Sequence, residues 1–351
     1  MRWSFVRLLR VRVLIVKTSS MGDVVHALPM VSDIARAFPQ ARIDWVVEEA
    51  FAEVPWLHPA ITRVFPVALR RWRRHPFAPA SWRELVAARR AIRELRYDAV
   101  IDCQGLVKSA LVAACARGPV MGPALACARE PLAALFYRRR IRFDRARHAV
   151  DRHRALGAAA LGYSLQAPED FGLRARVRQM QGPVLQGAAG AARDGPSGGV
   201  EGAGENAVLL LTHASRASKR WPDAHWIALE HELARSGCRS WLTWGGEAER
   251  RASEELATRM RSARVLPRST LVQLAAFASR VRLVVGLDTG LTHLSAAVGA
   301  PTVGIFCDYD VSLVGLRGGG ATVSLGGVGQ TPAVAQVLAA VAEVERAPCV
   351  R

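Results

Sequence analysis

Long uninterrupted hydrophobic runs are missing from this sequence, although half of its 351 residues are hydrophobic. No stretch approaches the roughly 20 apolar residues that a membrane-spanning helix requires. Arginines interrupt the first residues and no small-residue cleavage site follows them, so we expect neither a membrane span nor a signal peptide. The apolar content and a length beyond one average domain predict two globular domains.

Cysteines and acidic residues are also few. The six cysteines show no CxxC pair and no metal-ligand spacing with histidines, which predicts reduced thiols in a cytosolic protein and no metal site. Only 30 Asp and Glu stand against 48 Lys and Arg, a formal net charge of +18. This excess favours an acidic partner such as nucleic acid, anionic lipid or a phosphorylated substrate, although a general arginine-rich composition explains part of it.

Two arginine clusters are too local to reflect composition alone, namely Arg70–Arg74 ("RRWRR") and Arg138–Arg140. Guanidinium groups bind carboxylates and phosphates through paired hydrogen bonds, so the first cluster suits an anionic substrate. Nucleic-acid binding and a merely solvated basic loop are the alternatives. No groove-reading motif or aromatic platform accompanies the cluster, which argues against nucleic acid.

Strand and helix patterns alternate along the first half of the chain. A β-branched run at Val13–Val16 predicts a strand buried on both faces, and apolar residues at helical spacing follow from Asp23 to Ala37. Further strands are expected at Arg42–Glu49 and at the start of 98–105, with a helix near Ser81–Leu95 between them. Strands that alternate with helices predict an α/β fold with a parallel sheet.

A stretch rich in Gly, Ala, Pro and Ser interrupts this rhythm at 181–206, and the rhythm then restarts. We interpret the stretch as a linker. The predicted organisation is a domain at 1–180, the linker at 181–206 and a second domain at 207–351, each domain doubly wound and Rossmann-like. Ligands of such sheets bind at the carboxyl ends of the strands, so a cleft between two facing domains is expected.

Polar clusters occur at several predicted strand ends. In "DTGLTHL", Thr289, Gly290 and Leu291 would offer backbone N–H groups to a phosphate at the start of a helix, with His293 as a further donor. A plain helix capped by Asp288 or Thr289 is the alternative. The segment is neither a P-loop nor GxGxxG.

Two further strand ends in the second half carry charged residues. "HASRASK" brings Ser215 and Lys219, and a lysine there either neutralises a diphosphate or is a solvated loop residue. "WGGEAE" brings Glu249, which either accepts hydrogen bonds from a ribose diol or simply complements a helix dipole. Local chemistry leaves both pairs of alternatives open.

The first strand ends in "KTSSMGD", which runs from Lys17 to Asp23. Hydroxyl groups, a glycine and a carboxylate at this position form either an ordinary strand-to-helix turn or part of a substrate site. The residues alone do not decide between the two.

Taken together, "VLIVKTSSMGDVVHALP", "DWVVEE", "RRWRR", "VIDCQGLVKSA", "AREPLAALFY" and "DTGLTHL" closely resemble glycosyltransferase family 9, and within it the heptosyltransferase I group, from about Arg12 to about Ala340. The resemblance implies the GT-B fold and an inverting transfer of L-glycero-D-manno-heptose from ADP-heptose to the inner Kdo residue of Kdo2-lipid A. It implies no cofactor and no metal.

The resemblance also implies residue roles. Asp23 is the expected general base, for which a near-normal pKa would suffice. The acceptor-binding residues are expected to be Ser19, Ser20, Gly22, Arg70, Arg73, Arg74 and Arg129. The donor-binding residues are expected to be Ser215, Lys219, Glu249, Asp288, Thr289, Gly290, Leu291 and His293.

The implied partners are ADP-heptose, Kdo2-lipid A and the anionic inner membrane surface, with no nucleic acid. The protein is expected to be a monomer in the cytoplasm, peripheral on the inner face of the cytoplasmic membrane, with the arginine clusters facing the lipid. Heptosyltransferase II or another family 9 transferase with a different acceptor is the alternative within this class. A non-catalytic basic binding protein is the alternative outside it.

Overall fold

The computed structural model describes residues 11–179 and 206–347. The chain divides into two compact units, Met1–Gly172 and Leu173–Arg351, and each is described here by itself. Most of the predicted linker lies outside the described residues. Within them, no helix combines the length and apolar character that would let it span a bilayer.

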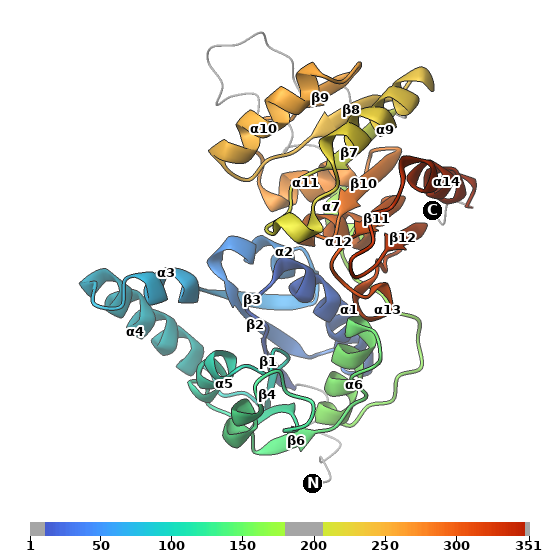
Figure 1. The fold of residues 1–351 in the computed structure, drawn as a ribbon. Coiled ribbons are helices and arrows are strands. Elements are labelled where there is room, and N and C mark those ends of the chain that lie inside the picture. Colours follow the sequence, from blue (N-terminus) through green and yellow to red (C-terminus); the bar gives the residue numbers. More distant parts are fainter. Residues whose placement is uncertain (1–10, 180–205, 348–351) are drawn as a thin grey trace. The chain divides into compact units, whose positions relative to one another are not determined.

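The first unit contains one parallel six-stranded sheet (Figure 1). Its strands, in spatial order, are β3 (Ile61–Val67), β2 (Arg42–Glu48), β1 (Arg12–Val16), β4 (Ala99–Asp102), β5 (Val120–Pro123) and β6 (Arg139–Ile141). Val13 pairs with Ile43 on one side and with Ala99 on the other, so β1 is central. Residues 13–16 are fully buried, as a parallel strand covered on both faces requires.

Helices cover this sheet and extend from it. They are α1 (Met21–Ala37), α2 (Glu53–Trp56), α3 (Leu69–Arg74), α4 (Pro79–Arg93), α5 (Val107–Ala114) and α6 (Ala149–Leu161), with short 3-10 turns at Glu49–Phe51 and Pro131–Phe136. Helix α1 packs against α6, while α3 and α4 form a hairpin that projects from the edge of the unit (Figure 1). The "RRWRR" cluster therefore lies on a helix, α3, and not in a loop.

The second unit repeats the same architecture. Its parallel sheet has the order β12 (Thr322–Gly326), β11 (Thr302–Phe306), β10 (Leu283–Leu287), β7 (Ala207–Leu211), β8 (Arg239–Leu242) and β9 (Ala263–Val265). The helices are α7 (Arg174–Gln179), α9 (Asp223–Arg235), α10 (Glu247–Thr258), α11 (Leu271–Ala278), α12 (Gly290–Ala297), α13 (Val311–Val314) and α14 (Val334–Arg346), with a 3-10 turn at Ala217–Lys219. Helix α7 contacts α11, which explains why the unit begins at Leu173.

The strand order reverses once in each sheet. The reversal lies between β1 and β4 in the first unit and between β7 and β10 in the second. In doubly wound sheets the loops on either side of such a point diverge and leave room for a ligand at the carboxyl ends of the strands. The predicted α/β fold with two doubly wound sheets is confirmed, and the two reversal points locate the candidate sites.

Candidate active site

In the first unit, Asp23 lies in the first turn of α1, directly after the β1 strand end. Its Oδ2 accepts hydrogen bonds from the backbone N–H of Ser20 (3.0 Å) and from the Ser20 hydroxyl (2.9 Å). Its Oδ1 lies 3.5 Å from the Nζ of Lys17. The segment therefore forms a strand-to-helix turn in which Asp23 ties down the N-cap residue. The same bonds fix the carboxylate in one orientation.

The surroundings of Asp23 keep it ionised. Burial alone would raise the pKa of this carboxyl, but the positive charges of Lys17 and Arg129, together with His26, outweigh burial and hold the pKa well below its ordinary value. The pKa of Asp23 is therefore lower than the near-normal value that would suffice for a general base. The Asp23 side chain is 28% exposed and that of Lys17 only 3%, so the carboxylate faces solvent with the ammonium beneath it.

The loop beneath Asp23 is held from the neighbouring strand by Gln104. This residue follows β4, and its Oε1 accepts from the backbone N–H and the hydroxyl of Thr18, both at 2.8 Å. Its amide nitrogen donates to the Ser19 hydroxyl at 3.3 Å. The β1 and β4 ends thus form one hydrogen-bonded floor at the reversal point. Gly22 is buried in the first turn of α1, next to this floor.

Arg129 reaches the same carboxylate from another loop, with its Nη1 4.0 Å from the Asp23 Oδ2 and its side chain 59% exposed. Burial lowers the pKa of Arg152, and Asp23 acts in the opposite direction, so a second arginine faces this region. An exposed carboxylate bordered by guanidinium groups is a surface that can receive anionic substrate groups.

The four arginines of α3 have different surroundings. Arg71 is held by Glu49 and Glu84 at 2.9 Å each, so it ties α3 to the rest of the hairpin. Arg70 stacks over the Phe51 ring at 5.5 Å. Arg70, Arg73 and Arg74 are all exposed, and none of the three has a carboxylate partner within the described part of the chain.

A buried carboxylate, Glu48 at the end of β2, connects α3 to the KTSS loop. Its Oε1 accepts from the backbone N–H of Arg70 at 3.0 Å, and its own N–H donates to the Thr18 carbonyl at 3.0 Å. The arginine helix and the Asp23 turn are thereby fixed to the same strand end. Sequence reasoning missed this role of Glu48, although its place at a strand end is visible in "DWVVEE".

In the second unit, Lys219 and Asp288 meet at the reversal point between β7 and β10. The lysine Nζ lies 2.6 Å from the Asp288 Oδ2 and 3.2 Å from the Asp288 carbonyl oxygen. The Oδ1 of the same carboxylate lies 3.3 Å from the Nε2 of His293, a buried residue on α12. Burial raises the pKa of Asp288, but His293 and Lys219 outweigh it, so the pKa is lowered and the carboxylate is ionised.

Helix α12 begins beside this cluster. Thr289 is its N-cap, and its hydroxyl lies 3.1 Å from that of Thr292 and caps no backbone N–H. Thr289, Gly290 and Leu291 are partly exposed, so the helix start is open to solvent. Free N–H groups at a helix start next to a lysine form a region of positive potential that suits a diphosphate.

Two predicted donor residues are not part of this cluster. Ser215 is exposed in the loop after β7, and Glu249 lies on α10, after the adjacent strand β8. The Oε2 of Glu249 accepts from the backbone N–H of Gly245 at 2.7 Å, which supports the local helix-start interpretation of this carboxylate.

Within residues 11–179 and 206–347, no group of three or more His, Cys, Asp or Glu side chains is arranged to hold a metal ion.

Comparisons with known proteins identify the family of the chain. The profile of glycosyltransferase family 9 (heptosyltransferase) matches residues 85–336. Lipopolysaccharide heptosyltransferase 1 of Escherichia coli K12 is 43% identical over 306 residues, which cover 87% of this chain and 90% of that protein. The chain belongs to glycosyltransferase family 9.

Solved family 9 structures extend this likeness to the fold. The E. coli heptosyltransferase WaaC with ADP superposes with a TM-score of 0.83 at 37% identity, covering 95% of this chain and 99% of that one. WaaC with ADP-2-deoxy-2-fluoro heptose gives a TM-score of 0.78 at 36% identity, with coverage of 95% and 98%. The family's GT-B fold, predicted from the motifs, is confirmed.

In this family 9 chain, the segment after β11 supports the loop that carries Lys219. Sequence reasoning did not single this segment out. The Asp308 Oδ2 accepts from the Ser218 hydroxyl at 2.9 Å and lies 3.7 Å from Arg216. The Tyr309 ring centroid lies 4.4 Å from the Nζ of Lys219. These two residues hold the Lys219 loop from a third strand end. The polar "CDYD" directly after a buried strand was the available signal.

Proposed function

We propose that this protein is a lipopolysaccharide heptosyltransferase that moves L-glycero-D-manno-heptose from ADP-heptose to the inner Kdo residue of Kdo2-lipid A, with inversion at the anomeric carbon. The observation that carries the proposal is the coincidence of two sites with a near-full-length likeness to WaaC. Asp23 with its basic surroundings suits an anionic sugar acceptor, and Lys219 beside the α12 start suits a diphosphate.

The donor site rests on the second unit. Lys219 and the N–H groups at Thr289, Gly290 and Leu291 would stabilise the negative charge that develops on ADP as it leaves. Asp288 holds the lysine and is itself held by His293, and the Asp288 carboxylate is also the group we expect to contact heptose hydroxyls. In the proposal, Ser215 borders this site from the loop after β7 and Glu249 borders it from α10. This fixed positive potential can serve where other transferases use a divalent metal, so we expect activity to persist in EDTA.

The acceptor site rests on the first unit. Arg70, Arg73, Arg74 and Arg129 would bind the carboxylates and phosphates of the acceptor, while Ser19, Ser20 and Gly22 form the floor beside Asp23. Inverting transfer needs one base beside the attacking hydroxyl. Asp23 is the carboxylate available there, because its side chain is partly exposed and Ser20 fixes its orientation.

The lowered pKa of Asp23 gives this role a condition. A strongly acidic carboxyl accepts a proton poorly, so the base must become more basic when the acceptor binds. An acceptor carboxylate or phosphate that takes up Arg129 would reduce the positive charge now lowering the pKa of Asp23. We therefore expect acceptor binding itself to prepare the base.

Because Kdo2-lipid A resides in a membrane, we propose that the protein works in the cytoplasm, peripheral on the inner face of the cytoplasmic membrane. The net charge of +18 suits that anionic surface.

The test is an assay of ADP release by the full chain. We expect release from ADP-heptose only when Kdo2-lipid A or its delipidated form is supplied. Release that instead requires an acceptor already carrying one heptose would indicate the heptosyltransferase II reaction. Absence of release with every acceptor, despite measurable donor binding, would support a non-catalytic binding protein and overturn the proposal.

A further inference from the structure

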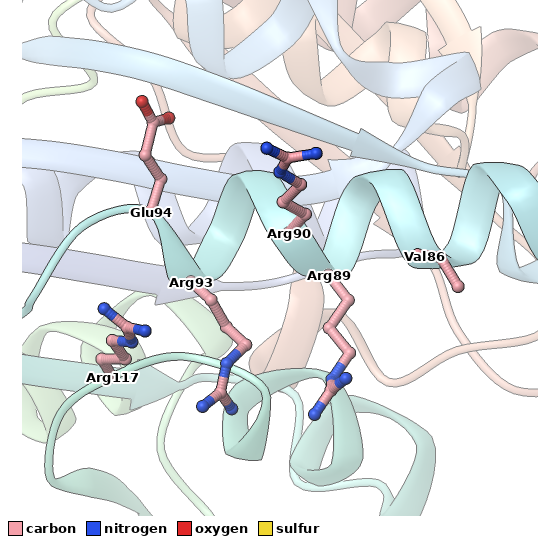
Figure 2. A pocket seen from close by; sticks show the side chains of 6 residues that line it. All are labelled: Val86, Arg89, Arg90, Arg93, Glu94 and Arg117. Carbon is pink, nitrogen blue, oxygen red and sulfur yellow. The ribbon is translucent and has the colours of Figure 1, made fainter.

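A hollow of about 370 Å³ lies on the first unit, between α4 and the loop after α5. Figure 2 shows Val86, Arg89 and Arg93 extending from one side of α4, with Arg117 beside the end of the helix. Arg90 and Glu94 complete the lining. None of these residues belongs to the candidate active site.

Positive charge in this hollow is uncompensated. Four of its lining residues are arginines, and the lone carboxylate, Glu94, lies 3.6 Å from a further arginine outside the hollow, Arg63. Within the described residues, none of the four lining arginines has an acidic partner within ion-pair distance. Arg93 instead makes a hydrogen bond to a backbone oxygen: its Nη1 donates to the Cys115 carbonyl at 3.4 Å. Like charges gathered without counter-charges favour an anionic ligand.

Helix α4 has a buried side and an exposed side, and the exposed side mixes apolar residues with arginines. The helix buries Ser81 and Ile92, and its Glu84 bonds inward to the Trp72 indole at 2.8 Å. An exposed stripe consists of Trp82, Val86 and Arg89, and the partly exposed Arg93 continues it, since the spacing places all four on one face. Two of them are apolar and yet well exposed, Trp82 at 58% and Val86 at 59%.

Apolar exposure continues at the tip of the hairpin. Phe77, in the turn between α3 and α4, is 92% exposed. Aromatic side chains next to arginines match the boundary of an anionic bilayer, where rings enter the headgroup region and guanidinium groups bind phosphates. A phosphopeptide site accounts for the arginines but leaves Trp82, Val86 and Phe77 unexplained. A nucleic-acid site would stack bases on the two rings but leaves Val86 unexplained.

We infer that the outward face of α4, made of Trp82, Val86, Arg89 and Arg93 with Arg117, docks this protein onto an anionic phospholipid membrane. This inference deepens the proposed function, because an acceptor carried by a lipid must be reached at a membrane surface. It adds α4 to the two arginine clusters that were expected to face the lipid.

The docking face and the predicted acceptor residues share one hairpin. Arg71 and Trp72 of α3 both bond to Glu84 of α4, so the two helices move together. Docking through α4 would therefore bring Arg70 and Arg73 to a lipid headgroup. Docking through α4 would thus set the distance of the acceptor arginines from the bilayer.

The experiment is co-sedimentation of the full chain with vesicles of phosphatidylglycerol and phosphatidylcholine, compared with vesicles of phosphatidylcholine alone. We expect binding to the anionic vesicles that weakens with salt. The double variant Arg89→Gln/Arg117→Gln should bind at least about tenfold more weakly, since each arginine near such a surface strengthens binding roughly fivefold. Trp82→Ala should weaken the binding that persists at high salt.

The matched control is Arg239→Gln/Arg264→Gln, which removes the same charge from exposed positions of the second unit. If this control loses as much binding as the α4 variant, or if the α4 variant binds vesicles like the wild type, the inference is wrong. Loss of binding to a short oligonucleotide with vesicle binding intact would also overturn it and assign the face to nucleic acid.

Activity on delipidated acceptor separates this inference from the proposed function. Arg89→Gln/Arg117→Gln should release ADP at the wild-type rate with that soluble acceptor. If vesicle binding falls as expected but no variant or wild-type protein releases ADP, the docking face stands and the proposed function fails. If ADP is released but vesicle binding does not depend on α4, the proposed function stands and the docking face fails.

Discussion

Each unit places a lysine and an aspartate side by side at its strand-order reversal, yet the two pairs differ. Lys17 and Asp23 are 3.5 Å apart, with the lysine buried and the carboxylate partly exposed. Lys219 and Asp288 are 2.6 Å apart, and both are largely buried. In the first unit the lysine tunes a carboxylate that faces solvent, and in the second the carboxylate holds a lysine beside a helix start. We propose the first pair as the place of the base and the second as the place of the bound diphosphate.

This contrast is sharpest in catalysis. Asp23→Asn should lower kcat by roughly 100- to 10,000-fold, the range typical of a lost general base. Initial rates of ADP release at saturating donor and acceptor measure the change.

The control for Asp23→Asn is Asp310→Asn, which also removes a carboxylate that accepts from a backbone N–H at a helix start, that of Ser312 at 2.9 Å. That variant should keep a near wild-type kcat. A wild-type rate in Asp23→Asn would mean that Asp23 is not the general base.

The arginines of α3 allow a comparison within one helix. Arg70→Gln/Arg73→Gln should raise the acceptor KM about tenfold or more, because each charged hydrogen bond contributes about 1.5–3 kcal/mol. The donor KM should stay near its wild-type value. Steady-state kinetics with each substrate varied in turn measure both constants.

Arg71→Gln is the matched variant, since Glu49 and Glu84 already occupy that guanidinium. It should leave the acceptor KM unchanged and change stability little, because exposed ion pairs contribute little. An acceptor KM that rises equally in both variants would mean that α3 acts through its fold and not through direct binding.

A smaller effect concerns stability against acid. The pKa values of Asp23 and Asp288 are lowered in the folded protein, so their ionised forms stabilise it above about pH 4, the ordinary pKa of the group, and this stabilisation is lost as pH falls through the folded pKa. Asp288→Asn should cost about 3 kcal/mol at neutral pH and Asp23→Asn about 1–2 kcal/mol, because the former pair is tighter and more buried.

Urea unfolding of both variants at neutral and acidic pH measures these costs. The gap to the wild type should shrink below about pH 4. A larger cost for Asp23→Asn than for Asp288→Asn would reverse the comparison between the two units.

The sequence predicts much of the fold because its signals are local. The buried run at Val13–Val16 and the helical spacing after it are readable without tertiary information, and the structure has β1 and α1 there. In the second half, the apolar runs on either side of "DTGLTHL" predict a strand, a helix and a second strand, and the structure has β10, α12 and β11 there. The start of α1 at Met21 differs from the expected Asp23, because the cap geometry of Ser20 is not visible in an apolar pattern.

The site could be predicted only in part, because its pairings join distant segments. Lys219 and Asp288 were assigned separately, and their ion pair depends on β7 and β10 being neighbours. The support from Gln104 depends likewise on β4 lying beside β1. The α4 hollow needs Arg117 from another loop, so no local pattern indicates it.

The most direct test of the division between the two units is calorimetric titration of ADP into the wild type, Asp23→Asn and Lys219→Met. We expect the same Kd for the wild type and Asp23→Asn, and a Kd at least about tenfold higher for Lys219→Met, since a charged hydrogen bond to the diphosphate is lost. Weakened ADP binding in Asp23→Asn, or unchanged binding in Lys219→Met, would contradict it.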